Sequence, residues 1–539
     1  MSTSPSLPGS AAPQPEPGPE RVSPIVHFLP SLSDLIFLLP FFLVLKDPKG
    51  LSLLLQDSDT GWHLRTGEWI LQNGRVPVAD LFSFTKAGQP WFAWEWLWDA
   101  VFGWLHLHAG LAAVAVVSLF VIAFSFTIVY RTALRHSRNV LLLLALMLLG
   151  MDVSTVHWLA RPHLFTLLFT ALFCAILDRV RSGNVRLLWL LPPLTILWTN
   201  LHGGFMVAIL LLVGLAAGEL FGWFVEADPR RAAKQLRRSW PYLLAAAGCG
   251  AASFVNPYGW QLHRHIFFYL FRENHADLIE EFQSLSFHGL EGALFAALLL
   301  VAIVCSVWHF VHRDFGASFL LLGWSWLAAY SVRNIPLFVL VMLPLAAGAI
   351  QQMIDRADLS AISTRARTAV REFLDTEADF AEMDRQWRTY LASVLCAGLF
   401  AAYALAPHPP AQLRARFDPR MFPVRAVDTC IAGLNAPRIF AHDQWGGYLI
   451  YRLYPRLRVF ADGRSDFYGP AFLKEWSGLR KGAYDWQKRL DKYSIDTVML
   501  PTDASLASTL KESPRWRVVY DDGVAIVFRD VQKSPAPAL

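Results

Sequence analysis

The chain alternates long apolar runs with short polar segments over most of its length. A bilayer core about 30 Å thick requires about 20 apolar residues in helical form. Runs of this kind centre on residues 31–46, 109–130, 139–156, 163–178, 187–200, 205–224, 241–255, 291–311, 316–332, 335–353 and 389–406. The pattern predicts a polytopic α-helical membrane domain over residues 31–406, with about eleven transmembrane helices.

Basic residues concentrate in every second connection between these runs. Arg clusters stand at 131–138, 179–186, 230–238 and 355–388, whereas 152–163, 200–204, 256–290 and 333–334 hold four Arg and no Lys. Short basic loops stay in the cytoplasm. We therefore expect the N-terminus inside, with residues 1–30 as a disordered cytoplasmic tail rich in Pro, Ser, Gly and Glu. The C-terminus is expected outside.

Composition supports the membrane class and removes others. Of 539 residues, 54% are hydrophobic and only 17% are charged, whereas a soluble domain carries about 25% charged residues. The net charge of +5 is too small to indicate nucleic-acid binding. The five Cys residues stand singly, without zinc or disulfide spacing, and we expect them to pack in apolar surroundings.

The segment after residue 407 differs from the rest, because it contains no further apolar run of spanning length. Alternating apolar positions predict strands at 438–441, 458–461 and 496–500 and a hairpin at 518–528. Helices are expected at 448–454 and 503–512. Residues 407–539 therefore read as a small α/β domain outside the membrane.

The first outer loop, residues 47–108, is polar and unusually aromatic. Residues 60–73 and 91–106 have the pattern of amphipathic helices, and this loop holds seven of the 21 Trp residues. Trp prefers the membrane–water interface. We expect both helices to lie flat on the outer leaflet.

Two carboxylates, Asp57 and Asp59, precede the first of these helices. Two carboxylates at this spacing can converge on a hard divalent cation such as Mg²⁺ or Mn²⁺. An Asp before a helix is also a common N-terminal cap. Carboxylates at the membrane face of an apolar chain are costly and usually functional, so both interpretations remain open.

The segment Asp57–Arg65 (DSDTGWHLR), followed by Gly74–Pro77, Asp80 and Gln89–Trp91, resembles the first outer loop of GT-C superfamily glycosyltransferases, closest in style to oligosaccharyltransferase catalytic subunits. The topology and the outer C-terminal domain are similar as well. The resemblance implies a GT-C-like fold and transfer of a sugar from a polyprenyl-phosphate or polyprenyl-pyrophosphate donor on the outer face. It implies that Asp57 or Asp59 acts as base or metal ligand. No organic cofactor is expected.

Further candidates lie in the other outer loops. Asp152 matches part of a second acidic motif of oligosaccharyltransferases, and His202 precedes Gly-Gly; both are candidate metal ligands. Arg161, His163 and Arg333 are candidates for binding the donor phosphate, since Arg forks onto phosphate oxygens. Lipid headgroup contacts and helix capping are the alternatives. Glu280 and Glu281 could position an acceptor or lie on a solvated helix face.

In the C-terminal domain, the polar, glycine-rich segments around Asp443, Trp445, Asp462 and Arg464 loosely resemble the acceptor-holding segment of oligosaccharyltransferases. A structural corner, with Asp462 and Arg464 as an internal ion pair, is the alternative.

These features together predict a metal-assisted membrane glycosyltransferase of the bacterial inner membrane. Its partners would be a lipid-linked sugar donor and an acceptor that is a glycan, a lipid or a protein. A transporter of lipid-linked glycans is disfavoured because the spans are almost free of charges. A non-catalytic protein of cell-envelope assembly is the other alternative, and it predicts replaceable carboxylates in the first outer loop.

Overall fold

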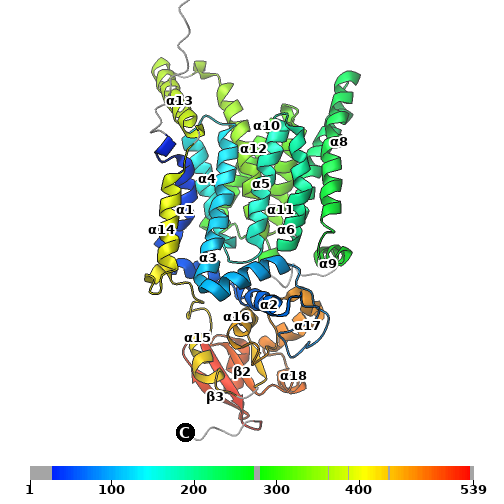
Figure 1. The fold of residues 1–539 in the computed structure, drawn as a ribbon, viewed down its shortest axis with the longest axis vertical. Coiled ribbons are helices and arrows are strands. Elements are labelled where there is room, and N and C mark those ends of the chain that lie inside the picture. Colours follow the sequence, from blue (N-terminus) through cyan, green and yellow to red (C-terminus); the bar gives the residue numbers. More distant parts are fainter. Residues whose placement is uncertain (1–26, 272–279, 362, 387, 435–436, 534–539) are drawn as a thin grey trace, which may run out of the picture.

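The computed structural model describes residues 27–271, 280–361, 363–386, 388–434 and 437–533. It consists of a helical bundle and a small α/β domain that lies against one end of the bundle (Figure 1). We call this end the domain end. The expected tail at 1–30 falls mostly outside the described residues.

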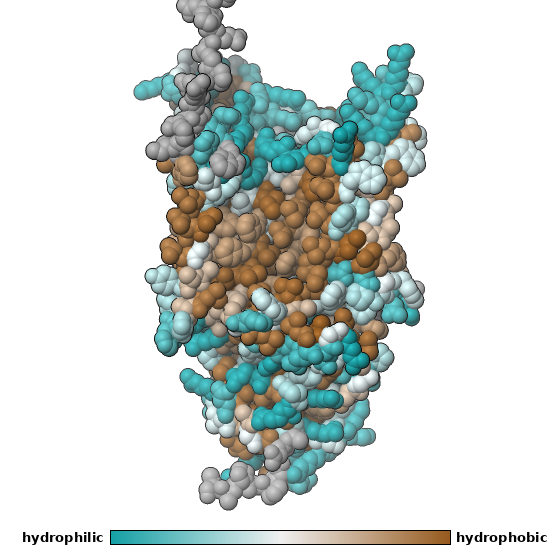
Figure 2. Space-filling view, viewed as in Figure 1, coloured by the Kyte–Doolittle hydropathy of each residue, from teal (hydrophilic) through white to brown (hydrophobic). Residues whose placement is uncertain are grey.

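Eleven helices of the bundle match the predicted spans. Their bounds are α1 (Leu32–Lys46), α3 (Trp96–Leu134), α4 (Val140–Ser154), α5 (His163–Arg181), α6 (Leu191–Leu201), α7 (Met206–Val225), α8 (Pro229–Ala252), α10 (Leu290–Val311), α11 (Phe315–Tyr330), α12 (Ile335–Asp355) and α14 (Leu391–Ala404). Hydrophobic surface forms a belt across the middle of the bundle, and hydrophilic surface lies at both ends (Figure 2). The chain is thus an integral membrane protein.

Six helical segments of the described chain are long and apolar enough to cross a bilayer: Trp96–Leu134, Val140–His157, His163–Arg181, Gly203–Val225, Leu290–Val311 and Val332–Asp355. The other five predicted spans form shorter or more polar helices. α1, α11 and α14 have 15, 16 and 14 residues, and the first half of α8 carries five basic residues. The predicted count of about eleven spans is therefore not confirmed.

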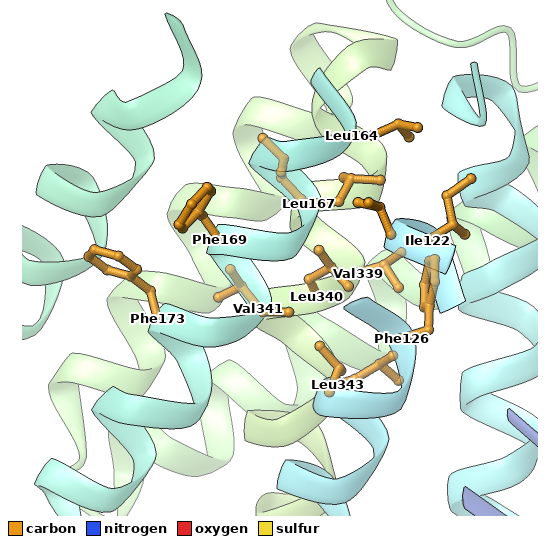
Figure 3. Packing of buried hydrophobic residues seen from close by; sticks show 14 of the residues in the cluster. Ile122, Phe126, Leu164, Leu167, Phe169, Phe173, Val339, Leu340, Val341 and Leu343 are labelled. Atoms are coloured by element: carbon orange, nitrogen blue, oxygen red, sulfur yellow. The ribbon is translucent and has the colours of Figure 1, made fainter. Parts of the chain in front are cut away.

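The centre of the bundle is formed by α3, α5 and α12, whose large apolar side chains interdigitate (Figure 3). Phe126 of α3, Phe173 of α5 and Leu340 of α12 are all fully buried. In a bilayer such close packing, rather than exclusion of water, holds helices together. It fixes the ends of α5 and α12, next to which Arg161 and Arg333 lie.

Two helical segments cross the domain end of the bundle (Figure 1). They are α2 (Asp59–Asn73) and the first part of α3, which turns into the bundle at Gly110. Gly110 has φ of 67°, a conformation that favours glycine because it has no Cβ. The predicted helix at 60–73 is confirmed, while the one predicted at 91–106 begins at Trp96 and continues into the span.

The C-terminal domain contains a four-stranded sheet in the order β1-β2-β4-β3. β1 (Ile439–Ala441) pairs parallel with β2 (Thr497–Pro501), and β4 (Ala525–Asp530) pairs antiparallel with β2 and β3 (Trp516–Asp521). The helices are α15 (Val424–Ala426), α16 (Asp443–Leu453), α17 (Ser465–Arg480), α18 (Trp486–Lys492) and α19 (Ser505–Lys511). Outside both parts lie α9 (Trp260–Phe271), at the domain end, and α13 (Thr364–Arg385), at the opposite end.

One predicted strand, 458–461, is wrong. Val459 forms an isolated bridge with Ser83 of the first outer loop. The apolar pattern that suggested a strand arises because Val459 and Phe460 are buried against neighbouring segments. This segment joins the domain to the loop at 47–108 instead of extending the sheet.

Glycines allow α2 and α16 to touch backbone to backbone. A Cβ on Gly447 would lie 2.2 Å from the carbonyl oxygen of Ser58, and one on Gly61 would lie 2.4 Å from that of Gly447. On another part of α2, a Cβ on Gly67 would lie 1.8 Å from the carbonyl oxygen of Asp99. α2 therefore packs between the C-terminal domain and α3. These two contacts fix the position of the N-terminus of α2.

We expect Gly447→Ala to destabilise the protein by about 1–3 kcal/mol, because the added methyl group would force α16 away from α2. Thermal unfolding of the purified protein in detergent measures this. Gly323→Ala is the matched control: it adds the same methyl group on α11, where no neighbouring atom lies within 4 Å of the added carbon. Equal melting temperatures for the two variants would contradict the close contact.

Candidate active site

The first residues of the site lie at the N-terminus of α2. One oxygen of Asp57, Oδ1, accepts a hydrogen bond from the backbone N–H of Asp59 at 2.8 Å, so Asp57 does cap the helix. Its other oxygen faces Arg161. The carboxylate of Asp59 lies against Gly463 of the C-terminal domain, where a Cβ would come within 1.9 Å of its Oδ1.

Arg161 joins three carboxylates. Its Nη1 lies 2.5 Å from Oδ2 of Asp57 and 3.1 Å from Oε1 of Glu281, and its Nη2 lies 3.1 Å from Oδ2 of Asp59. Only 18% of the Arg161 side chain is exposed. Charged groups buried to this extent persist only when they are paired. The arginine thus connects the first outer loop with the fourth, residues 256–290.

Hydrogen bonds to backbone carbonyls hold the segments around Arg161 and Glu281 in place. The N–H of Ala160 donates to the carbonyl of Leu54 at 2.7 Å, and the hydroxyl of Thr60 donates to the carbonyl of Ala160 at 3.1 Å. On the other side, the hydroxyl of Ser331 donates to the carbonyl of Glu281 at 2.8 Å. The backbone next to Arg161 is therefore bonded to the first outer loop. The backbone of Glu281 is bonded to Ser331, two residues before Arg333.

Arg333 is the more available of the two arginines. Its Nη2 lies 3.8 Å from Oε2 of Glu281, and its guanidinium lies over the ring of Phe282 at 4.6 Å. About a third of its side chain is exposed. Most of its N–H groups can therefore bind an incoming anion, whereas those of Arg161 face carboxylates.

Three imidazoles lie at the same end. The rings of His157 and His163 are 5.1 Å apart, and those of His163 and His202 are 6.5 Å apart. Nδ1 of His202 accepts the N–H of Gly204 at 3.0 Å, which places the ring proton on Nε2. Burial, with the nearby charges of Arg333 and Arg161, lowers the pKa of His202 to about 3. His202 is thus a neutral ring with an N–H donor.

The carboxylates differ in their affinity for protons. Burial and the neighbouring charge of Asp57 raise the pKa of Asp59 to about 8, although Arg161 acts in the opposite direction. Burial alone would raise the pKa of Glu281, but the guanidinium groups of Arg161 and Arg333 outweigh it and lower that pKa. Near neutral pH, Glu281 is ionised, and Asp59 is the carboxyl group able to exchange a proton.

The expected metal site stays a prediction. Within the part of the chain that the structure describes, no group of three His, Cys, Asp or Glu side chains is placed to hold a metal ion. Arg161 lies between the carboxylates that would have to converge. In this arrangement the residues do not fit a divalent cation.

The remaining candidates lie apart from this cluster. Asp152 is exposed in the last turn of α4, and the side chain of Glu280 falls outside the described residues. Asp443 pairs with His442 and Arg480, and the buried indole of Trp445 donates to the carbonyl of Met421 at 2.8 Å. All three of these contacts lie within the C-terminal domain.

Asp462 and Arg464 form the internal ion pair considered as the alternative, at 2.7 Å. Arg464 also contacts Asp80 of the first outer loop at 2.8 Å, and all three side chains are buried. The pair therefore locks the domain to the loop. It also holds Gly463, between them, against Asp59.

A second polar group near the site was not among the predicted site residues. His265 of α9 stacks on Trp94, with ring centroids 4.4 Å apart, and lies 3.2 Å from Asp466. Burial and the charge of Asp466 raise the pKa of nearby Glu95 to about 7. The Trp-rich pattern at 91–98 marked this place, but no local pattern indicated that His265 and Asp466 meet there.

The fold has a known counterpart. No protein-family model and no curated protein sequence matches the chain. Among solved structures, it is similar to the oligosaccharyltransferase of Archaeoglobus fulgidus in the apo form, with a TM-score of 0.51 and 12% identity over 87% of this chain and 68% of that one. At this identity the likeness concerns the fold: the chain has a GT-C-like fold.

The raised pKa of Glu95 predicts a pH dependence of stability. A carboxyl group whose pKa is higher in the folded protein keeps a proton that the unfolded chain has released, so stability falls as pH rises between the two values. For Glu95 this window runs from the ordinary 4.5 to about 7. Gln mimics the protonated form of Glu. As pH rises through this window, Glu95→Gln should therefore lose less folding stability than wild type.

Melting temperatures in detergent at several pH values between about 5 and 8 measure this difference. Glu291→Gln, at an exposed position in the first turn of α10, is the matched control and should follow wild type. Parallel curves for Glu95→Gln and wild type would show that Glu95 keeps its ordinary proton affinity.

Proposed function

We propose that the chain is a membrane glycosyltransferase that moves a sugar from a polyprenyl-phosphate or polyprenyl-pyrophosphate donor to an acceptor. The observation that carries this proposal is the cluster of Asp57, Asp59, Glu281, Arg161 and Arg333 at the domain end of an apolar bundle. Such a boundary suits a substrate with a lipid tail and a charged head. The GT-C-like fold supports the same class of reaction.

The proposed step is a displacement at the anomeric carbon of the donor sugar. A hydroxyl or amide group of the acceptor forms the new bond to this carbon, while the bond between the carbon and the donor phosphate oxygen breaks. The electron pair of the broken bond leaves with the polyprenyl phosphate. The proton of the acceptor passes to a carboxylate, so that atoms and charge balance.

Asp59 is the proposed base. General bases work best when their pKa lies near the working pH, and the pKa of Asp59 is raised to about 8. Asp57 holds the backbone N–H of Asp59 and a guanidinium nitrogen of Arg161, so it orients both groups.

Arg333 and the N–H of His202 are the proposed contacts of the departing phosphate. Fixed donors placed where charge develops stabilise the transition state strongly in a site shielded from water. Arg333 is suited to this because, among the described residues, its guanidinium contacts only Glu281, at 3.8 Å, and the ring of Phe282. The C-terminal domain, in contact with Asp59 through Gly463, would face the acceptor.

Two of the basic loops, 131–138 and 179–186, lie together at the opposite end of the bundle, where Arg135 and His136 pair with Asp178 and Arg181 pairs with Asp314. This arrangement supports an outer location for the domain end. We propose the bacterial inner membrane as the site of action.

Native mass spectrometry of the purified protein with its co-purifying lipids tests this function. Asp59→Asn should block transfer and accumulate an adduct with the mass of a polyprenyl-phosphate sugar, at least severalfold above wild type. Asp152→Asn is the matched control, since it removes an exposed carboxylate outside the cluster, and it should resemble wild type. Bulk phospholipid alone in all three proteins would favour the non-catalytic alternative.

Arg333→Ala should weaken donor binding more than the chemical step. Loss of a charge-assisted hydrogen bond costs about 1.5–3 kcal/mol, which corresponds to roughly a 10- to 100-fold higher KM for the donor. Steady-state kinetics with the donor identified above measure it. Arg264→Ala, at an exposed position of α9 at the same end, is the control, and an unchanged KM in Arg333→Ala would refute the phosphate contact.

A further inference from the structure

The guanidinium of Arg161 lies where three carboxylates converge. Asp57 and Asp59 reach it from the start of α2, and Glu281 reaches it from the fourth outer loop, with nitrogen–oxygen distances of 2.5, 3.1 and 3.1 Å. Both of its terminal nitrogens are engaged. Carboxylate oxygens gathered around one point from separate segments are also the ligand set of a hard divalent cation.

A guanidinium and a divalent cation cannot occupy this point together. Both would need the oxygens that face it, and their like charges would repel at such short distance. With Arg161 in place, Asp57 uses its Oδ1 for the N–H of Asp59 and its Oδ2 for the arginine. Both oxygens of Asp57 are therefore already engaged when Arg161 is in place.

The backbone on either side holds Arg161 in place. Ala160 is hydrogen-bonded through both its N–H and its carbonyl to Leu54 and Thr60, which flank the two aspartates. On the other side of Arg161, Pro162 directly precedes the first turn of α5. The contacts that form the loop therefore also place Arg161 next to the carboxylates.

We propose that the guanidinium of Arg161 takes the position of a divalent cation in this protein, so that the chain itself supplies the cation that pairs with Asp57, Asp59 and Glu281 and the site needs no bound metal ion. The functional meaning of this substitution rests on the proposed glycosyl transfer. The substitution itself concerns only the ligand that these carboxylates hold. The donor phosphate would then be left to Arg333 and His202.

Binding of Mn²⁺ to the full-length protein in a phosphate-free detergent, followed by electron paramagnetic resonance, tests the proposal. Wild type should show no saturable site tighter than about 1 mM, whereas Arg161→Met should gain one site that is at least about tenfold tighter, because three carboxylates are left without their cation. Adding Asp59→Asn to Arg161→Met should remove that site.

Two matched variants separate charge from position. Arg161→Lys keeps a cation among the carboxylates and should bind no Mn²⁺. Arg333→Met removes the neighbouring guanidinium, which contacts only Glu281 among them, and should bind none either. A wild type that binds one Mn²⁺ and loses it in Asp59→Asn would overturn the proposal, and so would a folded Arg161→Met without a new site.

If Arg161→Met fails to fold, wild type and Arg161→Lys still decide the matter, since saturable Mn²⁺ binding by either one contradicts the proposal and its absence from both supports it. The readout is metal binding and not sugar transfer. A failure of the proposed function, seen as absence of a donor adduct, is therefore distinguishable from a failure of this inference.

Discussion

The ion pairs of Arg161 with Asp57, Asp59 and Glu281 are the interaction on which the domain end depends. Carboxylates this close to an apolar bundle need a partner, because burying an unpaired charge is far more costly than burying a paired one. A single guanidinium supplies that partner for two separate loops. The pairing fixes where the loops lie and brings Arg333 alongside. Burial and the charge of Asp57, against the effect of Arg161, leave Asp59 as the carboxyl group that can exchange a proton.

The C-terminal domain contributes to this site through backbone rather than through reactive side chains. Gly447 and Gly61 let α16 contact α2, and Gly463 leaves space for the carboxylate of Asp59. The buried Arg464, paired with Asp80 and Asp462, holds that glycine in place. A domain that is small and distant in sequence therefore sets the position of the proposed base, while the contacts of Asp443 and Trp445 lie within the domain itself.

Much of this architecture could be predicted from the sequence, because apolar runs and loop charges are local signals. All eleven runs form helices, and α2 begins within one residue of its predicted start. The pairing of Asp57 with Arg161 could not be predicted, since 104 residues separate them and no local pattern encodes the contact. The strand predicted at 458–461 is wrong for a related reason: this segment is buried against the first outer loop and not against a neighbouring strand. An apolar pattern predicts that a segment is buried, but it does not show which segment packs against it.

The most direct test of the sugar-transfer site is a cryo-electron microscopy structure of Asp59→Asn in nanodiscs made from its native membrane lipids. We expect density for a lipid with its phosphate beside Arg333 and His202, its sugar facing residue 59 and its tail along the bundle. A lipid-linked sugar bound instead at the opposite end, in the cavity of about 270 Å³ lined by Asp178, Arg181 and Asp314, would contradict the proposed site.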